Sequence, residues 1–577
     1  MKLHVLALDY DGTIAIDGAL DPQVRLAIAA VRERGFVVVL ATGRILDDLR
    51  CVLGDLTLFD AVVAENGAVI AFPALGRSTQ LSPRVAPEFA AALRARGVAV
   101  RTGACVVELA AADSEIALRT VRELELPLTL HFNRDRLMVL PPAVSKATGL
   151  REALRTMRLS THNAIAIGDA ENDHELLAAC EIGAAVAWGS AALRRSADRI
   201  VPGDGPAAVA RYLDALTTSE QAPSELPARR RLVLGRDRTG DVVSLAVRGR
   251  NVLIAGDPRS GKSWVGGLLC EQLIVQQYCT CIIDPEGDYT ELEALPGVIV
   301  LGSDRPPSLH EVARILRHSD LSLVLDLTQL GAVEKHDYVL QALRLLTEVR
   351  TQTGLPHRIV VDEAHYFLHD PAEAGILDLA AGSHTLITYR VSGLAAEVLR
   401  SAECVVVTRE SDPAEARLLH EAFAGRGEAA KWTAELAGLE LDEAVLLPVS
   451  PEAGGRLRRF RVAPRLTRHV RHRHKYLDVP AVGERAFRFR LDGALGPSAA
   501  SLSELVQVLT CTPVERFREH VDRGDISRWI GEVLCDGTLA AAVRDIEEQH
   551  RLGRALDFND AVIHAIRERY GVAETLI

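Results

Sequence analysis

Two aspartates lie two residues apart near the N-terminus, in the sequence LALDYDGT. Asp9 and Asp11 follow an apolar run rich in β-formers, so we expect them at the carboxyl end of a strand, where open α/β sheets place their ligands. Such a pair suits one nucleophile and one general acid/base, with a magnesium ion between them. The alternative interpretation is a solvated acidic loop, so the rest of the chain has to supply the other groups of a site.

Three later segments supply further polar groups beside predicted strands and helices. LATGR ends a second apolar run, a helix-like segment follows a lysine, and IAIGDAENDHELL ends a third run in acids. The side chains concerned are Thr42, Arg44, Lys146, Asp169, Asn172 and Asp173. Only six of the 66 basic residues are lysine, and the others are arginine. A lysine in such a chain indicates a place that needs a compact ammonium group rather than a guanidinium.

In this order, the four segments resemble the haloacid dehalogenase superfamily over the first 215 residues. The resemblance implies that Asp9 is the phosphorylated nucleophile and Asp11 the general acid/base. It implies Mg²⁺ bound by Asp9, the backbone carbonyl of Asp11 and Asp169, with Asp173 in support. The remaining implied roles are two phosphate clamps, Thr42 and Lys146, and two substrate contacts, Arg44 and Asn172.

The spacing between these segments predicts an inserted domain. Thr42 and Lys146 lie 104 residues apart, far more than the core connection needs. We therefore expect a cap at roughly 75–140, which resembles the C2-type cap of the Cof-like or archaeal phosphoglycolate phosphatase subgroup. That subgroup hydrolyses small phosphomonoesters, mostly of sugars and organic acids. The specificity residues of such a cap carry no readable motif, so the substrate stays open at this point.

The middle of the chain holds a second phosphate-binding pattern, GDPRSGKS, between the apolar run NVLIA and a helix-like segment. Its residues are Gly256, Asp257, Pro258, Arg259, Ser260, Gly261, Lys262 and Ser263. This is the context of a P-loop, in which backbone N–H groups and a helix N-terminus surround the phosphates of a nucleotide. Lys262 would reach the terminal phosphates, and the Ser263 hydroxyl would bind Mg²⁺.

About a hundred residues later, the sequence RIVVDEAH places two acids after another apolar run. Asp362 would complete the metal shell, and Glu363 would polarise the attacking water. An adjacent glutamate of this kind favours an ATP hydrolase over a small-molecule kinase, which needs no water-activating carboxylate.

The P-loop, the segment IIDPEGDY and VDEAH together resemble the HerA/FtsK-type ATPases, a branch that includes DNA-pumping hexamers. The resemblance implies ATP as ligand and a homo-oligomer formed through this domain. One position departs from the family pattern. Where the later strand of the family commonly ends in Thr-Gln-Arg, this chain has ITYR, with Tyr389 in place of the sensor glutamine.

These segments predict an α/β multidomain chain. We expect a HAD-like Rossmannoid parallel sheet with a C2-type α+β cap at 1–215, a linker at 217–230, and a RecA/HerA-like P-loop α/β domain at 231–450. A basic connector at 456–480 and a mainly helical C-terminal domain at 481–577 follow. The nine cysteines form no CxxC pair, and no run of 18 apolar residues occurs, so we expect a cytoplasmic protein without a membrane partner.

Three functions compete at this stage. The first is a bifunctional enzyme, a Mg²⁺-dependent phosphatase of a small phosphorylated metabolite joined to an ATP-hydrolysing domain. The second is a nucleic-acid translocase or processing ATPase whose phosphatase domain acts on nucleotide or nucleic-acid phosphates. The third is an interaction protein with one vestigial site. The net charge of −12 and Tyr389 favour the first over the second, although the basic stretch 456–475 fits the second. Two complete sets of motifs disfavour the third.

Overall fold

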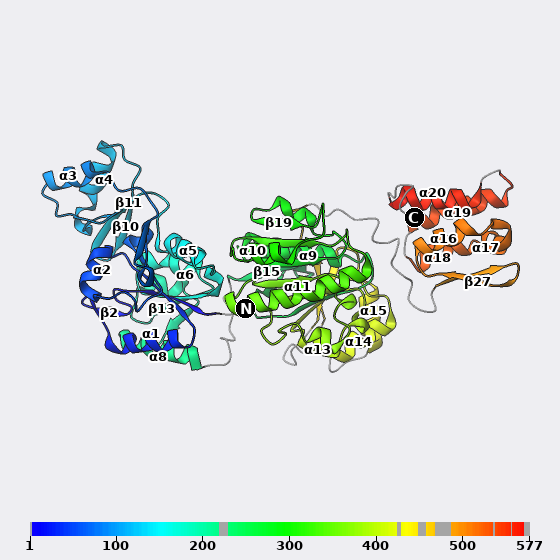
Figure 1. Ribbon diagram of the computed structural model, residues 1–577, viewed down its shortest axis with the longest axis horizontal. Helices are drawn as coiled ribbons and strands as arrows, with labels where there is room; N and C mark the ends of the chain where they lie inside the picture. The colour runs from blue at the N-terminus through cyan, green and yellow to red at the C-terminus, as the bar shows by residue number, and fades with distance from the viewer. Residues whose placement is uncertain are drawn as a thin grey trace. The chain divides into compact units, whose positions relative to one another are not determined.

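The computed structural model describes residues 3–218, 229–247, 249–423, 429–447, 457–467, 486–534, 537–554 and 557–570 (Figure 1). Contacts divide the chain into one unit of Met1–Pro285 and Tyr289–Arg468 and a second of Glu286–Asp288 and His469–Ile577. Most of the predicted linker 217–230 and of the predicted basic connector 456–480 lies outside the described residues. Across the described part of the chain, no helix combines the length and the apolar character that a membrane crossing requires.

An eight-stranded sheet forms the N-terminal core, in the order β14-β13-β12-β1-β4-β5-β6-β7. Its strands are β1 (Val5–Asp9), β4 (Val37–Ala41), β5 (Ala61–Ala64), β6 (Val69–Phe72), β7 (Arg77–Gln80), β12 (Ala164–Gly168), β13 (Ile182–Val186) and β14 (Arg199–Val201). The strands from β14 to β5 are parallel, and β6 and β7 are added antiparallel. A parallel core of this kind is the arrangement expected from the alternating apolar and helix-like runs.

Helices cover both faces of this sheet (Figure 1). They are α1 (Pro22–Glu33), α2 (Leu46–Leu53), α5 (Lys146–Thr156), α6 (His174–Ala179), α7 (Ala191–Ser196) and α8 (Pro206–Thr218). Leu6 and Leu8 of β1 point to the cluster that includes α1 and α8, whereas Val5 and Ala7 point to the cluster with α5, α6 and α7. All five residues of β1 are therefore buried, which is why this strand reads as a continuous apolar run up to Asp9.

A small antiparallel sheet lies between β7 and α5 in the sequence, in the order β10-β11-β9-β8. It consists of β8 (Arg101–Thr102), β9 (Val107–Ala110), β10 (Thr129–Asn133) and β11 (Arg136–Leu140), with α3 (Pro87–Ala95) and α4 (Ser114–Glu123). Phe89 and Leu93 of α3 pack with Val121 of α4 and Leu137 and Val139 of β11 in a core of their own. This inserted α+β layer is called the cap below. A hairpin of β2 (Ala15–Ile16) and β3 (Ala19–Leu20) follows Asp11 in the core domain.

The middle of the chain forms an eleven-stranded sheet, in the order β16-β15-β25-β24-β23-β17-β22-β21-β18-β20-β19. The strands from β23 to β19 are parallel, and β24, β25, β15 and β16 extend the sheet antiparallel. The parallel strands are β17 (Val252–Ala255), β18 (Thr280–Asp284), β19 (Val298–Leu301), β20 (Ser322–Asp326), β21 (Arg358–Val361), β22 (His384–Thr388) and β23 (Cys404–Val407). The others are β15 (Arg231–Asp237), β16 (Val242–Ala246), β24 (Glu443–Leu447) and β25 (Arg458–Val462).

Helices also cover this sheet, and two separate hydrophobic clusters lie on its two faces. The helices are α9 (Lys262–Val275), α10 (Leu309–Ile315), α11 (Ala332–Thr353), α12 (Pro371–Ala374), α13 (Ala396–Ser401), α14 (Pro413–Phe423) and α15 (Ala429–Ala437). Helix α9 is apolar on most sides, because it is covered both by the parallel strands and by β15. The structure thus has a second α/β layer system after residue 230.

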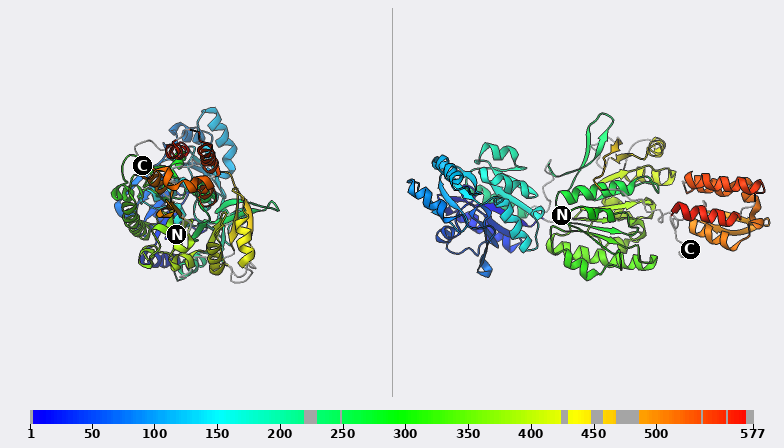
Figure 2. Two further views of the ribbon diagram at one scale, coloured as in Figure 1. Left: turned by 90° about the vertical axis from the view of Figure 1, so that its right-hand side faces the viewer. Right: turned by 90° about the horizontal axis from the view of Figure 1, so that it is seen from above.

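After residue 468, the described part of the second unit begins with a hairpin of β26 (Phe487–Leu491) and β27 (Ala494–Ala499). Five helices follow, α16 (Leu502–Cys511), α17 (Arg518–Arg523), α18 (Asp525–Glu532), α19 (Gly537–Arg551) and α20 (Phe558–Tyr570) (Figures 1 and 2). Phe489, Phe517, Trp529 and Phe558 meet in the core of this unit. The region is mainly helical, with one hairpin at its start.

Candidate active site

The order of the strands brings the N-terminal polar residues together. Strands β4, β1 and β12 are adjacent and parallel, so their carboxyl ends lie at one edge of the sheet. Asp9 ends β1, Thr42 follows β4 and Asp169 follows β12. Lys146 is the first residue of α5, whose N-terminus is capped by Ser145. Residues that are up to 160 positions apart in the sequence thereby share one site.

An acidic cluster forms the buried part of this site. Ligand atoms of Asp9, Asp169 and Asp173 lie within 4.8 Å of one another, and all three residues are buried. The Lys146 ammonium donates to Asp9 Oδ1 at 2.5 Å and to Asp173 Oδ1 at 2.7 Å. Asp173 Oδ2 accepts the backbone N–H groups of Asp169 and Ala170 at 3.0 and 3.1 Å. Asp173 therefore orients the loop and the lysine, while Asp9 lines the cavity and Asp169 lies beside it.

The charges in the cluster are unbalanced. Burial, followed by the negative charge of Asp173, raises the pKa of Asp9 well above its usual value, although Lys146 lowers it. Burial and Asp173 raise the pKa of Asp169 in the same way. Burial alone would lower the pKa of Lys146, but the carboxylates of Asp173 and Asp9 raise it. Three buried carboxylates face two cationic groups, Lys146 and Arg134, and such a cluster of oxygen ligands fits a divalent cation like Mg²⁺.

We expect Lys146→Met to destabilise the core domain more at pH 8 than at pH 5.5. Without the ammonium, the carboxylates of Asp9 and Asp173 stay buried without their cationic partner, which costs about 3–5 kcal/mol. The pKa of Asp9 is raised in the folded state and rises further without Lys146. The free energy of unfolding of the variant therefore decreases as the pH rises and Asp9 ionises, and it increases again as the pH falls. Hydrogen exchange of peptides covering β1 and β12, without divalent cations, measures the opening free energy. Lys431→Met, at an exposed lysine of α15, is the control, and an equal loss at both pH values in Lys146→Met would contradict the assignment.

Asp11 lies at the more open side of the site and is held by Arg44. The guanidinium donates to the two carboxylate oxygens of Asp11, at 2.7 Å each. The side chain of Asp11 is 40% exposed. Thr42 Oγ1 accepts the backbone N–H of Arg44 at 3.1 Å, which fixes the turn after β4. The structure thus places Arg44 as the partner that orients Asp11, a contact that the sequence pattern does not reveal.

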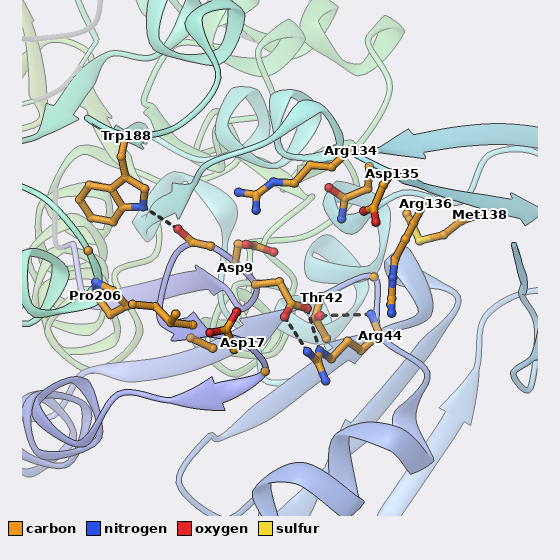
Figure 3. Close-up of a pocket in the computed structure, with 18 of the residues that line it drawn as sticks. Asp9, Asp17, Thr42, Arg44, Arg134, Asp135, Arg136, Met138, Trp188 and Pro206 are labelled. Carbon is orange, nitrogen blue, oxygen red and sulfur yellow. Dashed lines mark hydrogen bonds and ion pairs between the residues drawn. The ribbon is translucent and has the colours of Figure 1, made fainter. Parts of the chain in front are cut away.

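A cavity of about 660 Å³ opens between this end of the sheet and the cap. Figure 3 shows Arg134, Arg136 and Met138 on the cap side of the cavity, facing the core side with Asp9, Thr42 and Arg44. The indole of Trp188 closes another side and donates to the Gly12 carbonyl at 2.8 Å. Arg136 pairs with Glu108 at 2.6 Å, and Arg134 contacts Asp169.

Sequence reasoning missed the cap residues and Trp188, since no motif surrounds them. It placed Asn172 at the substrate, and the structure places its side-chain amide 3.4 Å from Asn66 Oδ1, beside the turn after β5. Asn172 is not among the side chains that line the cavity. The length of the insertion between Thr42 and Lys146 predicted that a cap exists, but it could not predict which cap residues line the cavity.

The predicted P-loop follows β17 and ends where α9 begins, at Lys262. Gly256 has a φ of 145°, and a Cβ atom there would lie 2.2 Å from Thr408 Oγ1, so only glycine fits. Ser260 Oγ lies 2.5 Å from the same Thr408 hydroxyl, which anchors the loop to the end of β23. The Lys262 ammonium donates to the Asp257 carbonyl at 2.7 Å. Ser263 is the second residue of α9, and Pro258, Arg259 and Gly261 complete the loop.

The predicted acids of the middle domain lie at the same edge of the sheet as this loop. Asp362 and Glu363 directly follow β21, which is parallel to β22 and β17. Both side chains are buried, and Asp362 Oδ1 accepts the backbone N–H of Glu363 at 2.9 Å. Tyr389, which replaces the expected glutamine, places its ring 5.9 Å from the Lys262 ammonium and its hydroxyl 3.1 Å from the hydroxyl of Tyr366.

The comparisons with known proteins concern the N-terminal domain. A family model described as haloacid dehalogenase-like hydrolase matches residues 6–103 and 110–213. The phosphoglycolate phosphatase of Methanosarcina acetivorans is 28% identical over 237 residues, which are 37% of this chain and 98% of that protein. The phosphoglycolate phosphatase of Natronomonas pharaonis is 32% identical over 208 residues, which are 34% of this chain and 89% of that protein.

Among solved structures, a haloacid dehalogenase-like hydrolase from B. subtilis is 17% identical, covers 37% of this chain and 99% of its own, and has a TM-score of 0.32. The sequence matches, and not this TM-score, show the family of the N-terminal domain. They extend over nearly the whole length of each relative, across both the core and the cap. Through residues 6–213, the chain belongs to the haloacid dehalogenase-like hydrolases, and this domain is a phosphatase domain of that family.

Proposed function

We propose that the N-terminal domain is a Mg²⁺-dependent hydrolase of small phosphomonoesters, joined to a middle domain that binds and hydrolyses ATP. The observation that carries the first part is the buried cluster of Asp9, Asp169 and Asp173 with Lys146, beside a cavity that Asp9 lines under the cap. The carboxylate proposed as the nucleophile (Asp9), the ammonium proposed to hold the phosphate (Lys146) and the carboxylate proposed to bind the cation (Asp169) therefore lie close together. The proposed domain boundaries are those of the sequence analysis, with the cap inserted between β7 and α5 and with β25 added to the middle domain, because it pairs with β15 and β24.

The reaction proceeds in two displacements on phosphorus. A carboxylate oxygen of Asp9 attacks, the bond from phosphorus to the ester oxygen breaks, and the carboxylic acid of Asp11 gives its proton to the leaving alcohol. Water then attacks the phosphoaspartate, Asp11 takes the proton of that water, and the bond from Asp9 to phosphorus breaks, which releases inorganic phosphate. In the structure both oxygens of Asp11 accept from Arg44, so one of these two bonds has to open when Asp11 carries the proton.

Lys146 and Thr42 are the residues proposed to hold the phosphate, because one is an ammonium group beside the nucleophile and the other a hydroxyl at the end of the adjacent strand. Mg²⁺, when bound by Asp9, Asp169 and the backbone carbonyl of Asp11, supplies positive charge that offsets the phosphate oxygens. Asp173 supports this set through Lys146 and the backbone of the acidic loop.

Removal of divalent cations is expected to abolish hydrolysis of p-nitrophenyl phosphate, and added Mg²⁺ is expected to restore it. Asp169→Asn removes one charge from the cation site, so the Mg²⁺ concentration for half-maximal rate should rise about tenfold or more. The measurement is a titration of initial rate against Mg²⁺ after chelation. Asp198→Asn, which alters a carboxylate that pairs with Arg229 outside the cavity, is the control. Full activity in excess chelator would refute the metal-dependent mechanism.

The ATP part of the proposal rests on the loop 256–263 and the two acids after β21. Lys262 and Ser263 begin α9, so its positive N-terminal end faces the loop where phosphates would lie. Asp362 is proposed as the acid of the Mg²⁺ shell and Glu363 as the group that polarises water. A homo-oligomer through this domain belongs to the same proposal.

The described part of the basic stretch favours the phosphatase-centred function over a nucleic-acid motor. Arg458 pairs with Asp237 at 2.8 Å, and Arg465 pairs with buried Glu271 at 2.8 Å. Arg459 pairs with Glu443. These guanidinium groups are thus bound to carboxylates of the same domain, as expected for a connector that packs on an acidic chain. The histidines of the stretch lie outside the described residues.

A further inference from the structure

One cap residue, Arg134, contacts the core's acidic cluster directly. It lies in the two-residue turn between β10 and β11, where Asn133 and Arg136 are paired across the hairpin. Its guanidinium donates to Asp169 Oδ2, a carboxylate that is almost fully buried. Thr13 Oγ1 donates to the other oxygen of Asp169 at 3.3 Å. The cap thus supplies a positive charge at one of the carboxylates assigned to the cation.

Two further observations describe the geometry of this contact. Arg134 has a φ of 55°, a left-handed conformation that costs a non-glycine residue roughly 1 kcal/mol or more. In addition, a Cβ atom at Gly12 would lie 2.4 Å from the Arg134 guanidinium and 2.6 Å from Asp169 Oδ2. The turn therefore holds a non-glycine residue in a left-handed conformation, and the absence of a side chain at Gly12 leaves the space that the guanidinium occupies beside Asp169.

The other arginines of the cavity have separate partners. Arg44 is bound by both oxygens of Asp11, and Arg136 is bound by Glu108 of the cap itself. Among the described residues that line the cavity, Arg134 is the one whose ion pair joins the cap to the carboxylate cluster. A cation bound by Asp9 and Asp169 and the guanidinium of Arg134 would each need the same carboxylate, and two positive charges at this distance repel each other.

We propose that Arg134 is a positioning residue that competes with the divalent cation for Asp169. Without the cation, the ion pair helps to hold the β10–β11 hairpin against the core, together with the contact of His131 with Asn66. When the cation takes Asp169, Arg134 loses its partner, the hairpin is held less tightly, and the guanidinium faces the cavity in which the phosphomonoester lies. Binding of the cation and opening of the cap are thereby linked, since each is favoured by loss of the same ion pair. This inference rests on the proposed function, because it takes the cation site as given.

Magnesium binding to the full-length protein, free of divalent cations and nucleotide, tests the competition by calorimetry. Arg134→Ala should bind Mg²⁺ about 3- to 10-fold more tightly than the wild type, since a competing charge is removed. Arg136→Ala removes a neighbouring arginine that pairs with Glu108, so it should change the affinity less than about twofold. The part of the isotherm that Asp169→Asn shifts to about tenfold or more weaker binding identifies this site. Equal or weaker Mg²⁺ binding by Arg134→Ala would overturn the proposal.

Hydrogen exchange of the peptide that covers Thr129–Asn133 and Arg136–Leu140 gives a second readout. In the wild type, exchange should increase when Mg²⁺ is added, and in Arg134→Ala it should be fast from the start and insensitive to Mg²⁺. A merely structural role would speed exchange but would not raise the affinity for Mg²⁺. If the wild type hydrolyses p-nitrophenyl phosphate but Arg134→Ala binds Mg²⁺ no more tightly, the competition is wrong and the phosphatase proposal stands. If the wild type does not hydrolyse the ester, the phosphatase proposal fails whatever the isotherms show.

Discussion

Asp9→Asn should lower the rate of p-nitrophenyl phosphate hydrolysis by at least a thousandfold, an order of magnitude typical of the loss of a nucleophile. The amide occupies the same place at the end of β1 and still accepts a hydrogen bond from Lys146, but it cannot form the phosphoaspartate. Because Asp9 is 4% exposed and enclosed by Asp169 and Asp173, no other carboxylate can reach the same position without a change in the backbone.

The measurement is the initial rate with saturating Mg²⁺, together with the ATPase rate of the same preparation. Asp47→Asn is the matched control, since the Asp47 side chain on α2 is 84% exposed and pairs only along its own helix. The control should keep the wild-type rate, and the ATPase rate should be unchanged in both variants. Phosphatase activity retained by Asp9→Asn would exclude Asp9 as the nucleophile. Loss of both activities would indicate misfolding, which exchange of the β1 peptide detects.

Lys262→Ala should lower ATP hydrolysis by about a hundredfold or more while hydrolysis of the aryl phosphate stays at the wild-type rate. The lysine starts α9 beside the loop, and loss of its charge leaves the terminal phosphates of the nucleotide without their cationic contact. Its ammonium now donates to the Asp257 carbonyl, so the loop retains its bond from Ser260 to Thr408 and should keep its fold.

Lys431→Ala serves as the control, because Lys431 is exposed on α15 and contacts neither the loop nor the acids after β21. Full ATPase activity in Lys262→Ala would contradict the nucleotide site. The same assay, run with and without duplex DNA at two salt concentrations, separates the two functions that the sequence left open. A motor should be stimulated by DNA at low salt and lose the effect at high salt, whereas the phosphatase-centred function predicts no stimulation.

The sequence predicted the N-terminal fold and family well, for a physical reason. A strand that is buried on both faces must be apolar throughout, so β1, β4 and β12 are visible as short apolar runs, and each ends where a polar side chain follows. Asp9, Thr42 and Asp169 are therefore readable from local sequence. The same reasoning predicts the runs of the middle sheet, where the loop after β17 and the acids after β21 have the same form. ATP binding by that site remains a prediction.

The contacts that give these residues their charges and partners depended on tertiary structure. Arg44 donates to the Asp11 carboxylate, and the Trp188 indole donates to the Gly12 carbonyl. Arg134 of the cap donates to the Asp169 carboxylate of the core. The two residues of each pair are far apart in the sequence. Periodicity and composition predict single strands and helices, but they do not predict the strand order that brings such residues together. Local sequence determines where a strand ends and which side chain stands there, because that depends on burial of the residues just before it. Which side chains then share one site depends on strand order and on the placement of the cap, and only the folded chain determines these.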